Sequence, residues 1–103
     1  MGRKRAERTA RRGRERAARQ IVRDRERLAA MSPGGAAEHP IGVPSASVIE
    51  VRAHAMPCAQ CEGEYRIADH RSAGNGVRCV DVVCRRCGVA RTLWFRITSD
   101  DPS

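Results

Sequence analysis

The stretch "CAQC", residues 58–61, is repeated in outline as "CRRC" at residues 84–87. A Cys-x2-Cys turn brings two sulfur atoms to one point through a tight loop, and two such turns supply the tetrahedron of thiolates that Zn²⁺ prefers at structural sites. The segment between the two turns, residues 62–83, is slightly longer than in the usual four-cysteine pattern. The pattern therefore predicts that one Zn²⁺ is bound by four ligands, namely Cys58, Cys61, Cys84 and Cys87.

Other uses of the cysteines fit the sequence less well. The chain has five cysteines, and an odd number suits a full disulfide framework poorly. Iron bound as in rubredoxin uses the same four thiolates, so the spacing does not separate Fe from Zn. Cys79 is expected to be a buried apolar side chain, rather than a substitute ligand or a redox-sensitive thiol. We expect His39, His54 and His70 not to bind the metal.

The residues around the two turns predict a small sheet. The segments "EYRIAD" (64–69), "VRCVDVV" (77–83) and "ARTLWFRIT" (90–98) are each typical of a strand. "SVIEV" (47–51) is expected to add a fourth strand. Between the first two strands, "HRSAGNG" (70–76) is expected to form a long hairpin loop that absorbs the extra spacing between the cysteine pairs.

These turns and strands resemble the zinc ribbon class over residues 56–98, with "PCAQCEGEY" as the first knuckle and "CRRCG" as the second. The resemblance implies a small three-stranded antiparallel sheet that holds one Zn²⁺ through the four cysteines. Together with a helical N-terminus, it predicts a small α+β protein with three to four antiparallel strands. Zinc ribbons occur in ribosomal proteins, transcription factors and polymerase subunits, and as appendages of enzymes, so the resemblance predicts a metal but not a partner.

The net charge of +8 is concentrated at the N-terminus. Residues 1–30 contain 12 Lys or Arg and four acidic residues, a balance of +8, whereas residues 31–103 contain eight of each kind. Any electrostatic contact with nucleic acid must therefore come from the first third of the chain. We expect a basic helical arm at 1–31, a flexible Pro/Gly linker at 32–46, the ribbon domain at 47–98 and a disordered tail at 99–103.

The basic arm is predicted to be helical because residues 3–30 contain no proline and are rich in Ala, Arg and Glu. At about 100° per residue, an apolar stripe follows one side, consisting of Ala6, Ala10, Ala17, Ile21, Leu28 and Met31. The opposite side carries the candidate nucleic-acid contacts, which are Arg5, Arg8, Arg12, Arg16, Arg19 and Arg23. We expect residues 17–31 to dock through the stripe, and the first 16 residues to be solvated.

The arm leaves several interpretations open. It could be a solvated charged helix, an arginine face that follows phosphates, or a helix that pairs with a partner. Attachment to a membrane surface is disfavoured because the stripe has no aromatic residue. No apolar run approaches the length of a bilayer span. Trp94 on the last predicted strand is expected to be covered by residues 17–31, or else to contact a base or a protein partner.

No constellation of residues in the sequence resembles a catalytic site, and four thiolates leave no open position on a metal for water. We therefore expect a non-enzymatic cytoplasmic protein, of bacterial origin given its preference for Arg over Lys. Its expected role is to contact nucleic acid, or a nucleic-acid machine such as the ribosome or the transcription apparatus, through the arginine face. The alternatives are a protein-interaction adaptor that binds through the sheet face around Trp94, and a redox-responsive zinc switch. The sequence does not predict an oligomeric state.

Overall fold

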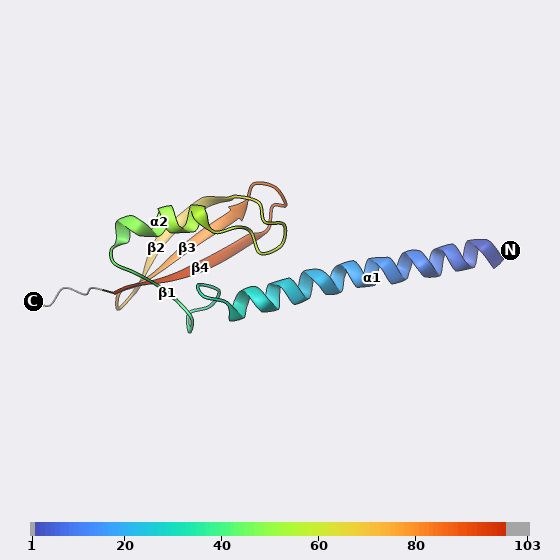
Figure 1. The fold of residues 1–103 in the computed structure, drawn as a ribbon, viewed down its shortest axis with the longest axis horizontal. Coiled ribbons are helices and arrows are strands. Elements are labelled where there is room, and N and C mark those ends of the chain that lie inside the picture. Colours follow the sequence, from blue (N-terminus) through green and yellow to red (C-terminus); the bar gives the residue numbers. More distant parts are fainter. Residues whose placement is uncertain (1, 99–103) are drawn as a thin grey trace, which may run out of the picture.

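The computed structural model describes residues 2–98 of the chain; the predicted disordered tail, residues 99–103, lies outside the described residues. The protein is a small α+β fold, as predicted, in which a long N-terminal helix projects from a sheet covered by a second, short helix (Figure 1). The elements in order are α1 (Gly2–Met31), β1 (Ile41–Val43), α2 (Ala46–Ala55), β2 (Tyr65–Gly74), β3 (Val77–Cys84) and β4 (Ala90–Ile97).

The four strands lie in the order β1-β4-β3-β2. Strands β2, β3 and β4 form the predicted antiparallel meander. The prediction of a wholly antiparallel sheet is wrong for the fourth strand, because β1 pairs with β4 in parallel. This strand lies inside residues 32–46, the segment expected to be a linker, where only the "IGV" triplet carries two β-branched residues. Its pairing places Ile41 opposite Phe95 and Val43 opposite Ile97.

The prediction of a strand at residues 47–51 is wrong, because this segment lies within helix α2. The β-branched residues of "SVIEV" suggested a strand, but the signals of a helix lie on either side of them. Ser45 stands at the N-cap position in an extended conformation, and Pro57 follows the C-terminus closely, which suits a helix that must stop there. Ile49 and Ala53, one turn apart, are the two buried residues of the helix.

The hairpin between β2 and β3 is tighter than predicted. Strand β2 continues to Gly74, so most of the expected loop is strand, and its register shifts twice relative to β3. Asn75 and Gly76 make the turn, with φ values of 54° and 78°. An Asn-Gly pair with both φ values positive is the preferred two-residue hairpin turn, because its twist matches that of the strands. The extra spacing between the cysteine pairs is therefore taken up by longer strands.

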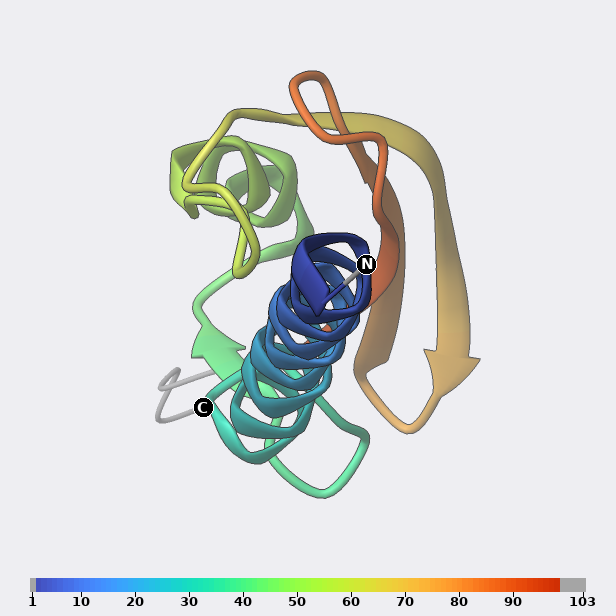
Figure 2. The same cartoon turned by 90° about the vertical axis from the view of Figure 1, so that its right-hand side faces the viewer.

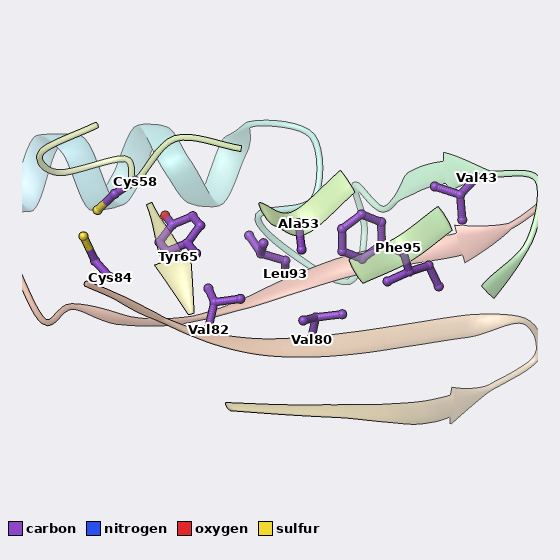
Figure 3. Packing of buried hydrophobic residues seen from close by; sticks show 10 residues of the cluster. Val43, Ala53, Cys58, Tyr65, Val80, Val82, Cys84, Leu93 and Phe95 are labelled. Carbon is purple, nitrogen blue, oxygen red and sulfur yellow. The ribbon is translucent and has the colours of Figure 1, made fainter. Parts of the chain in front are cut away.

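The core lies between α2 and the sheet. Ile49 and Ala53 of the helix meet Val80 and Val82 of β3 and Phe95 of β4, all at most 1% exposed. Figure 3 shows this layer continuing to Tyr65 and ending at Cys58 and Cys84, whose sulfur atoms point toward each other. The core is small, and its end at the cysteines is where a metal could close it.

Helix α1 projects along the long axis of a molecule that measures 78 × 23 × 18 Å (Figures 1 and 2). The prediction that it docks through its apolar stripe is wrong: Ile21, Leu28 and Met31 are 50%, 64% and 66% exposed. Instead, α1 makes polar contacts with the domain through Val22, Arg25 and Glu26, which lie on a different side of the helix.

Candidate metal centre

The four predicted ligands come together at one end of the core. The sulfur atoms of Cys58, Cys61, Cys84 and Cys87 all lie within 4.8 Å of one another. The Cys58 and Cys87 sulfurs are 3.7 Å apart, and those of Cys61 and Cys84 are 3.4 Å apart. Since four sulfurs at about 2.3 Å from one tetrahedral Zn²⁺ are about 3.8 Å apart, the cluster has the dimensions of such a site.

The two cysteine pairs have the same backbone geometry. In the first, the Cys58 amide donates to the carbonyl of Gly63, and the Glu62 amide donates to the carbonyl of Cys58. In the second, the Cys84 amide donates to the carbonyl of Val89, and the Gly88 amide donates to the carbonyl of Cys84. Both turns thus form the same knuckle, although 26 positions separate them in sequence (84 minus 58).

Equivalent positions in the two knuckles are occupied by a glycine in one and by a strained non-glycine residue in the other. Gly88 has a φ of 78°, a conformation that glycine adopts without strain. Its counterpart in the first knuckle is Glu62, a non-glycine residue with a φ of 64°. The first knuckle therefore carries backbone strain that the second does not.

Backbone amides point at the sulfur atoms in both knuckles. The amides of Gln60 and Gly63 lie 3.4 Å from the sulfurs of Cys58 and Cys61, and those of Arg86 and Cys87 lie 3.3 and 3.4 Å from the sulfur of Cys84. Hydrogen bonds from amides favour a thiolate over a thiol. All four residues lie within the knuckles, so the turn geometry itself supplies these donors.

The shifts in the pKa values of two thiols agree with a site for a cation. The amides of Cys87 and Arg86, in that order of effect, lower the pKa of Cys84 to about 6. For Cys87, the amide of Val89 lowers the pKa, but local desolvation and the neighbouring sulfurs outweigh it and raise the pKa to about 12. When several thiols lie close together, ionisation of one makes ionisation of its neighbours less favourable. The low pKa of Cys84 beside the high pKa of Cys87 is the result. A bound dication would offset that repulsion and allow all four thiolates to form.

Gly63 is required by close packing against the sulfurs. A Cβ atom at this position would lie 3.0 Å from the Cys84 sulfur, 3.1 Å from the Cys61 sulfur and 2.9 Å from the Cβ of Arg86. We expect Gly63→Ala to displace a knuckle and to weaken metal binding at least tenfold, about 1.4 kcal/mol. Competition with a chromophoric chelator measures the affinity. Gly42→Ala is the matched control, because its Cβ would meet its nearest neighbour at 3.6 Å; an equal loss in both variants would contradict this reason.

The remaining candidate ligands lie apart from the cluster. Cys79 is 1% exposed and is therefore a buried cysteine, as predicted. The residues opposite it on the adjacent strands are Arg71 of β2 and Trp94 of β4. His54 contacts the carbonyl of Tyr65 through its Nδ1 atom, and His70 lies in β2 opposite Val80. Within residues 4–98, the metal-ligating cluster consists of the four cysteines and includes no histidine.

Tyr65 connects the metal centre to the long helix, a role that the sequence analysis missed. Its hydroxyl accepts hydrogen bonds from the amide of Ala59, in the first knuckle, and from the Nε atom of Arg91, each at 3.2 Å. Burial raises the pKa of Tyr65, which keeps the hydroxyl neutral. Arg91 in turn forms an ion pair with Glu26 of α1. Glu26 and Arg91 are 65 positions apart in sequence, and no local pattern indicates that they meet.

A second contact joins the first knuckle to α1 directly. The Gln60 side chain donates to the carbonyl of Val22 at 2.9 Å, and Arg25 donates to the carbonyl of Gln60 at 2.7 Å. Apolar packing is incomplete at this junction, because a cavity of about 240 Å³ remains between α1, Met56 and Leu93. The arm is thus held by polar contacts, and Gln60, which lies between two of the metal ligands, makes two of them.

We expect the Glu26→Gln/Gln60→Ala double variant to uncouple the arm from the domain, since it removes a charge and a side-chain donor from this junction. In ¹⁵N relaxation, residues 22–29 of the original chain should tumble with the strands, whereas in the double variant they should show a shorter correlation time. Glu15→Gln, which disrupts only the exposed Arg11–Glu15 pair, is the control. Identical relaxation in all three proteins would show that these contacts do not fix the arm.

The other predicted site residues lie away from the metal centre. The six arginines of the arm (Arg5, Arg8, Arg12, Arg16, Arg19 and Arg23) are all exposed on α1. Trp94 is half-buried, its amide donates to the carbonyl of Gly34, and it lies opposite Cys79. By register, it is on the side of the sheet away from α2, next to the Arg71–Asp81 ion pair. The contacts of α1 with the domain do not include this side.

Comparison of the chain with protein-family models, with curated proteins and with solved structures finds no match. No helix in residues 2–98 combines the length and apolar character needed to cross a bilayer. The four-cysteine cluster, the two equivalent knuckles and the antiparallel meander are consistent with the zinc ribbon class. The functional assignment accordingly rests on the geometry of this chain.

Proposed function

We propose that this protein is a non-catalytic zinc protein of the cytoplasm that contacts nucleic acid, or a nucleic-acid machine such as the ribosome or the transcription apparatus, through the arginine face of α1. Zinc is the metal of choice because four thiolates at tetrahedral spacing suit it. With four protein ligands the shell is closed, which favours a structural metal over a catalytic one. Cysteines that bind a metal instead of forming disulfides suit a reducing compartment.

The observation that carries the proposal is the exposed arginine face. Its six arginines are exposed, and none of them forms an ion pair within residues 4–98. They extend from Arg5 to Arg23, which is a rise of about 27 Å along the helix. A row of guanidinium groups without acidic partners on a projecting helix is suited to phosphates, since arginine binds them with two parallel hydrogen bonds.

The net charge of the domain also favours α1, and not the domain, as the part that contacts nucleic acid. Residues 31–103 are formally neutral, and four thiolates around one dication would add a net charge of −2. The domain would then repel phosphates weakly, while the arm attracts them. The contacts with Gln60 and Arg91 hold the C-terminal part of α1, so that the arginine face has a defined direction, about 90° around the helix from the residues that contact the domain.

The experiment is a titration of fluorescently labelled duplex DNA and RNA with the full metal-loaded chain at two salt concentrations. Contacts with six phosphates predict a loss of affinity of about 10³-fold between about 50 and about 200 mM salt. Absence of binding at low salt would overturn the proposal.

A second candidate function is a protein-interaction adaptor, and one observation favours it. In Figure 2, both helices lie on one side of strands β2 to β4, and no element of residues 2–98 covers the other side. This side carries Trp94, an aromatic residue of the kind that anchors protein partners. The adaptor becomes the leading candidate if the titration detects no binding of either nucleic acid.

A further inference from the structure

Helix α1 has a third side that makes none of the hydrogen bonds with the domain and lies apart from the arginine face, although its Leu28 lines the cavity between α1 and the domain. The large apolar residues on this side, Ile21, Leu28 and Met31, are 50%, 64% and 66% exposed. Successive residues of a helix are turned by about 100° around its axis. Measured around that axis, the centre of this side lies about 110° from the residues that contact the domain and about 160° from the centre of the arginine face. A partner on this side would therefore leave the other two contacts undisturbed.

The residues on this side lie at heptad spacing, and three of the eight are charged. Alternating steps of three and four residues connect Glu7, Ala10, Arg14, Ala17, Ile21, Asp24, Leu28 and Met31, which we call the seam. Such spacing is that of the a and d positions of a coiled coil. The seam is divided by size, with alanines in its N-terminal half and the large apolar residues in its C-terminal half. Each half carries a charge at its centre, Arg14 in the first and Asp24 in the second, and Glu7 adds a charge at the N-terminal end of the first.

We propose that the seam is the interface of an antiparallel homodimer, in which α1 of one protomer packs against α1 of a second copy. The antiparallel arrangement places Ile21 beside the partner's Ala17 and Leu28 beside the partner's Ala10. In the same register Asp24 faces the partner's Arg14, and this charge pair occurs twice because of the two-fold symmetry. Every a position then faces a d position, as antiparallel helices require; Ile21 and Leu28 each face an alanine, whereas Met31 faces the partner's Glu7.

A parallel dimer does not achieve this match. In register, it would pair Arg14 with the partner's Arg14 and Asp24 with the partner's Asp24, and it would leave the alanine halves facing each other. Like charges in contact across an interface are costly. The proposed partner at the seam is therefore a second copy of this chain in the antiparallel orientation. The inference does not depend on the proposed nucleic-acid contact, although an antiparallel pair would leave both arginine faces exposed.

The net positive charge of the arms opposes pairing, so the test must separate the seam charges from the total charge. Arg14→Asp and Asp24→Arg change the net charge in opposite directions, yet each places like charges in contact twice per dimer. Both residues are exposed on α1, so neither substitution should affect folding, which circular dichroism verifies. In the Arg14→Asp/Asp24→Arg double variant, the two charge pairs are restored with reversed polarity.

The experiment is sedimentation equilibrium of the full metal-loaded chain, freed of nucleic acid, at about 0.15 M salt, where the Debye length is about 8 Å. The original chain and the double variant should be dimers, and each single variant should dimerise at least about tenfold more weakly. An equimolar mixture of the two single variants should form a heterodimer, because each then offers the charge that the other needs. A monomeric original chain, or a mixture that does not associate more tightly than its components, would overturn the proposal.

Discussion

Removal of the metal should unfold the sheet domain. A structural zinc can supply on the order of 10 kcal/mol of folding free energy in a small domain, which is comparable with the whole stability of a typical protein. Among residues 4–98, 11 hydrophobic residues are buried, and two of them, Cys58 and Cys84, belong to the candidate metal site. Without the metal, the thiols of Cys58 and Cys84 would lie at the end of the core beside the thiols of Cys61 and Cys87. We expect a chelator to abolish the cooperative thermal transition, monitored by the fluorescence of Trp94.

The choice of probe and control makes this result interpretable. Far-ultraviolet circular dichroism would still record helix from α1 after the domain unfolds, whereas Trp94 belongs to β4 and reports on the sheet. Cys84→Ser should reproduce the effect of the chelator. Cys79→Ala, a change of another buried cysteine outside the cluster, should lower the melting temperature but retain a cooperative, chelator-sensitive transition. A melting curve that is identical with and without chelator would show that the fold does not need a metal.

Neutralising arginines on the exposed face of α1 should weaken nucleic-acid binding according to their position. Removal of one phosphate contact should reduce the dependence of log K on log salt by about 0.9 for duplex DNA. Arg12→Gln/Arg16→Gln removes two charges from the arginine face and should therefore reduce this slope by about 2. Fluorescence anisotropy at four or more salt concentrations measures the slope.

The matched control is Lys4→Gln/Arg11→Gln, which removes the same charge from the same part of α1 but on a different side. Both of these residues are exposed. We expect the control to reduce the slope by less than half as much. Equal slopes for the two variants would mean that binding follows the net charge of the arm and not its arginine face.

The four-cysteine cluster could be predicted from sequence because the spacing of its cysteines is a local property. A Cys-x2-Cys turn forms its own knuckle, and the hydrogen-bond pattern shared by residues 58–63 and 84–89 needs no information from elsewhere in the chain. The three antiparallel strands were predictable for the same reason, since each carries its own β-branched or aromatic residues. The helix-forming tendency of residues 1–31 was also local.

The errors arose where distant contacts decided the structure. Residues 47–51 looked like a strand in isolation, but burial of Ile49 and Ala53 one turn apart stabilises a helix over the sheet. β1 is three residues long and depends on pairing with β4. The docking side of α1 could not be found from its apolar stripe, because the contacts with Gln60 and Arg91 are polar. The Asn75-Gly76 turn, in contrast, was a local signal that was overlooked.

The central claim is that four cysteines bind one zinc ion and thereby complete the fold, and native mass spectrometry of the intact chain tests it most directly. The account predicts a mass of the chain plus one zinc per protomer, with loss of zinc and a shift to highly charged, unfolded ions when the cysteines are alkylated. A compact, metal-free chain lighter by about four mass units, as two disulfides would produce, would contradict it.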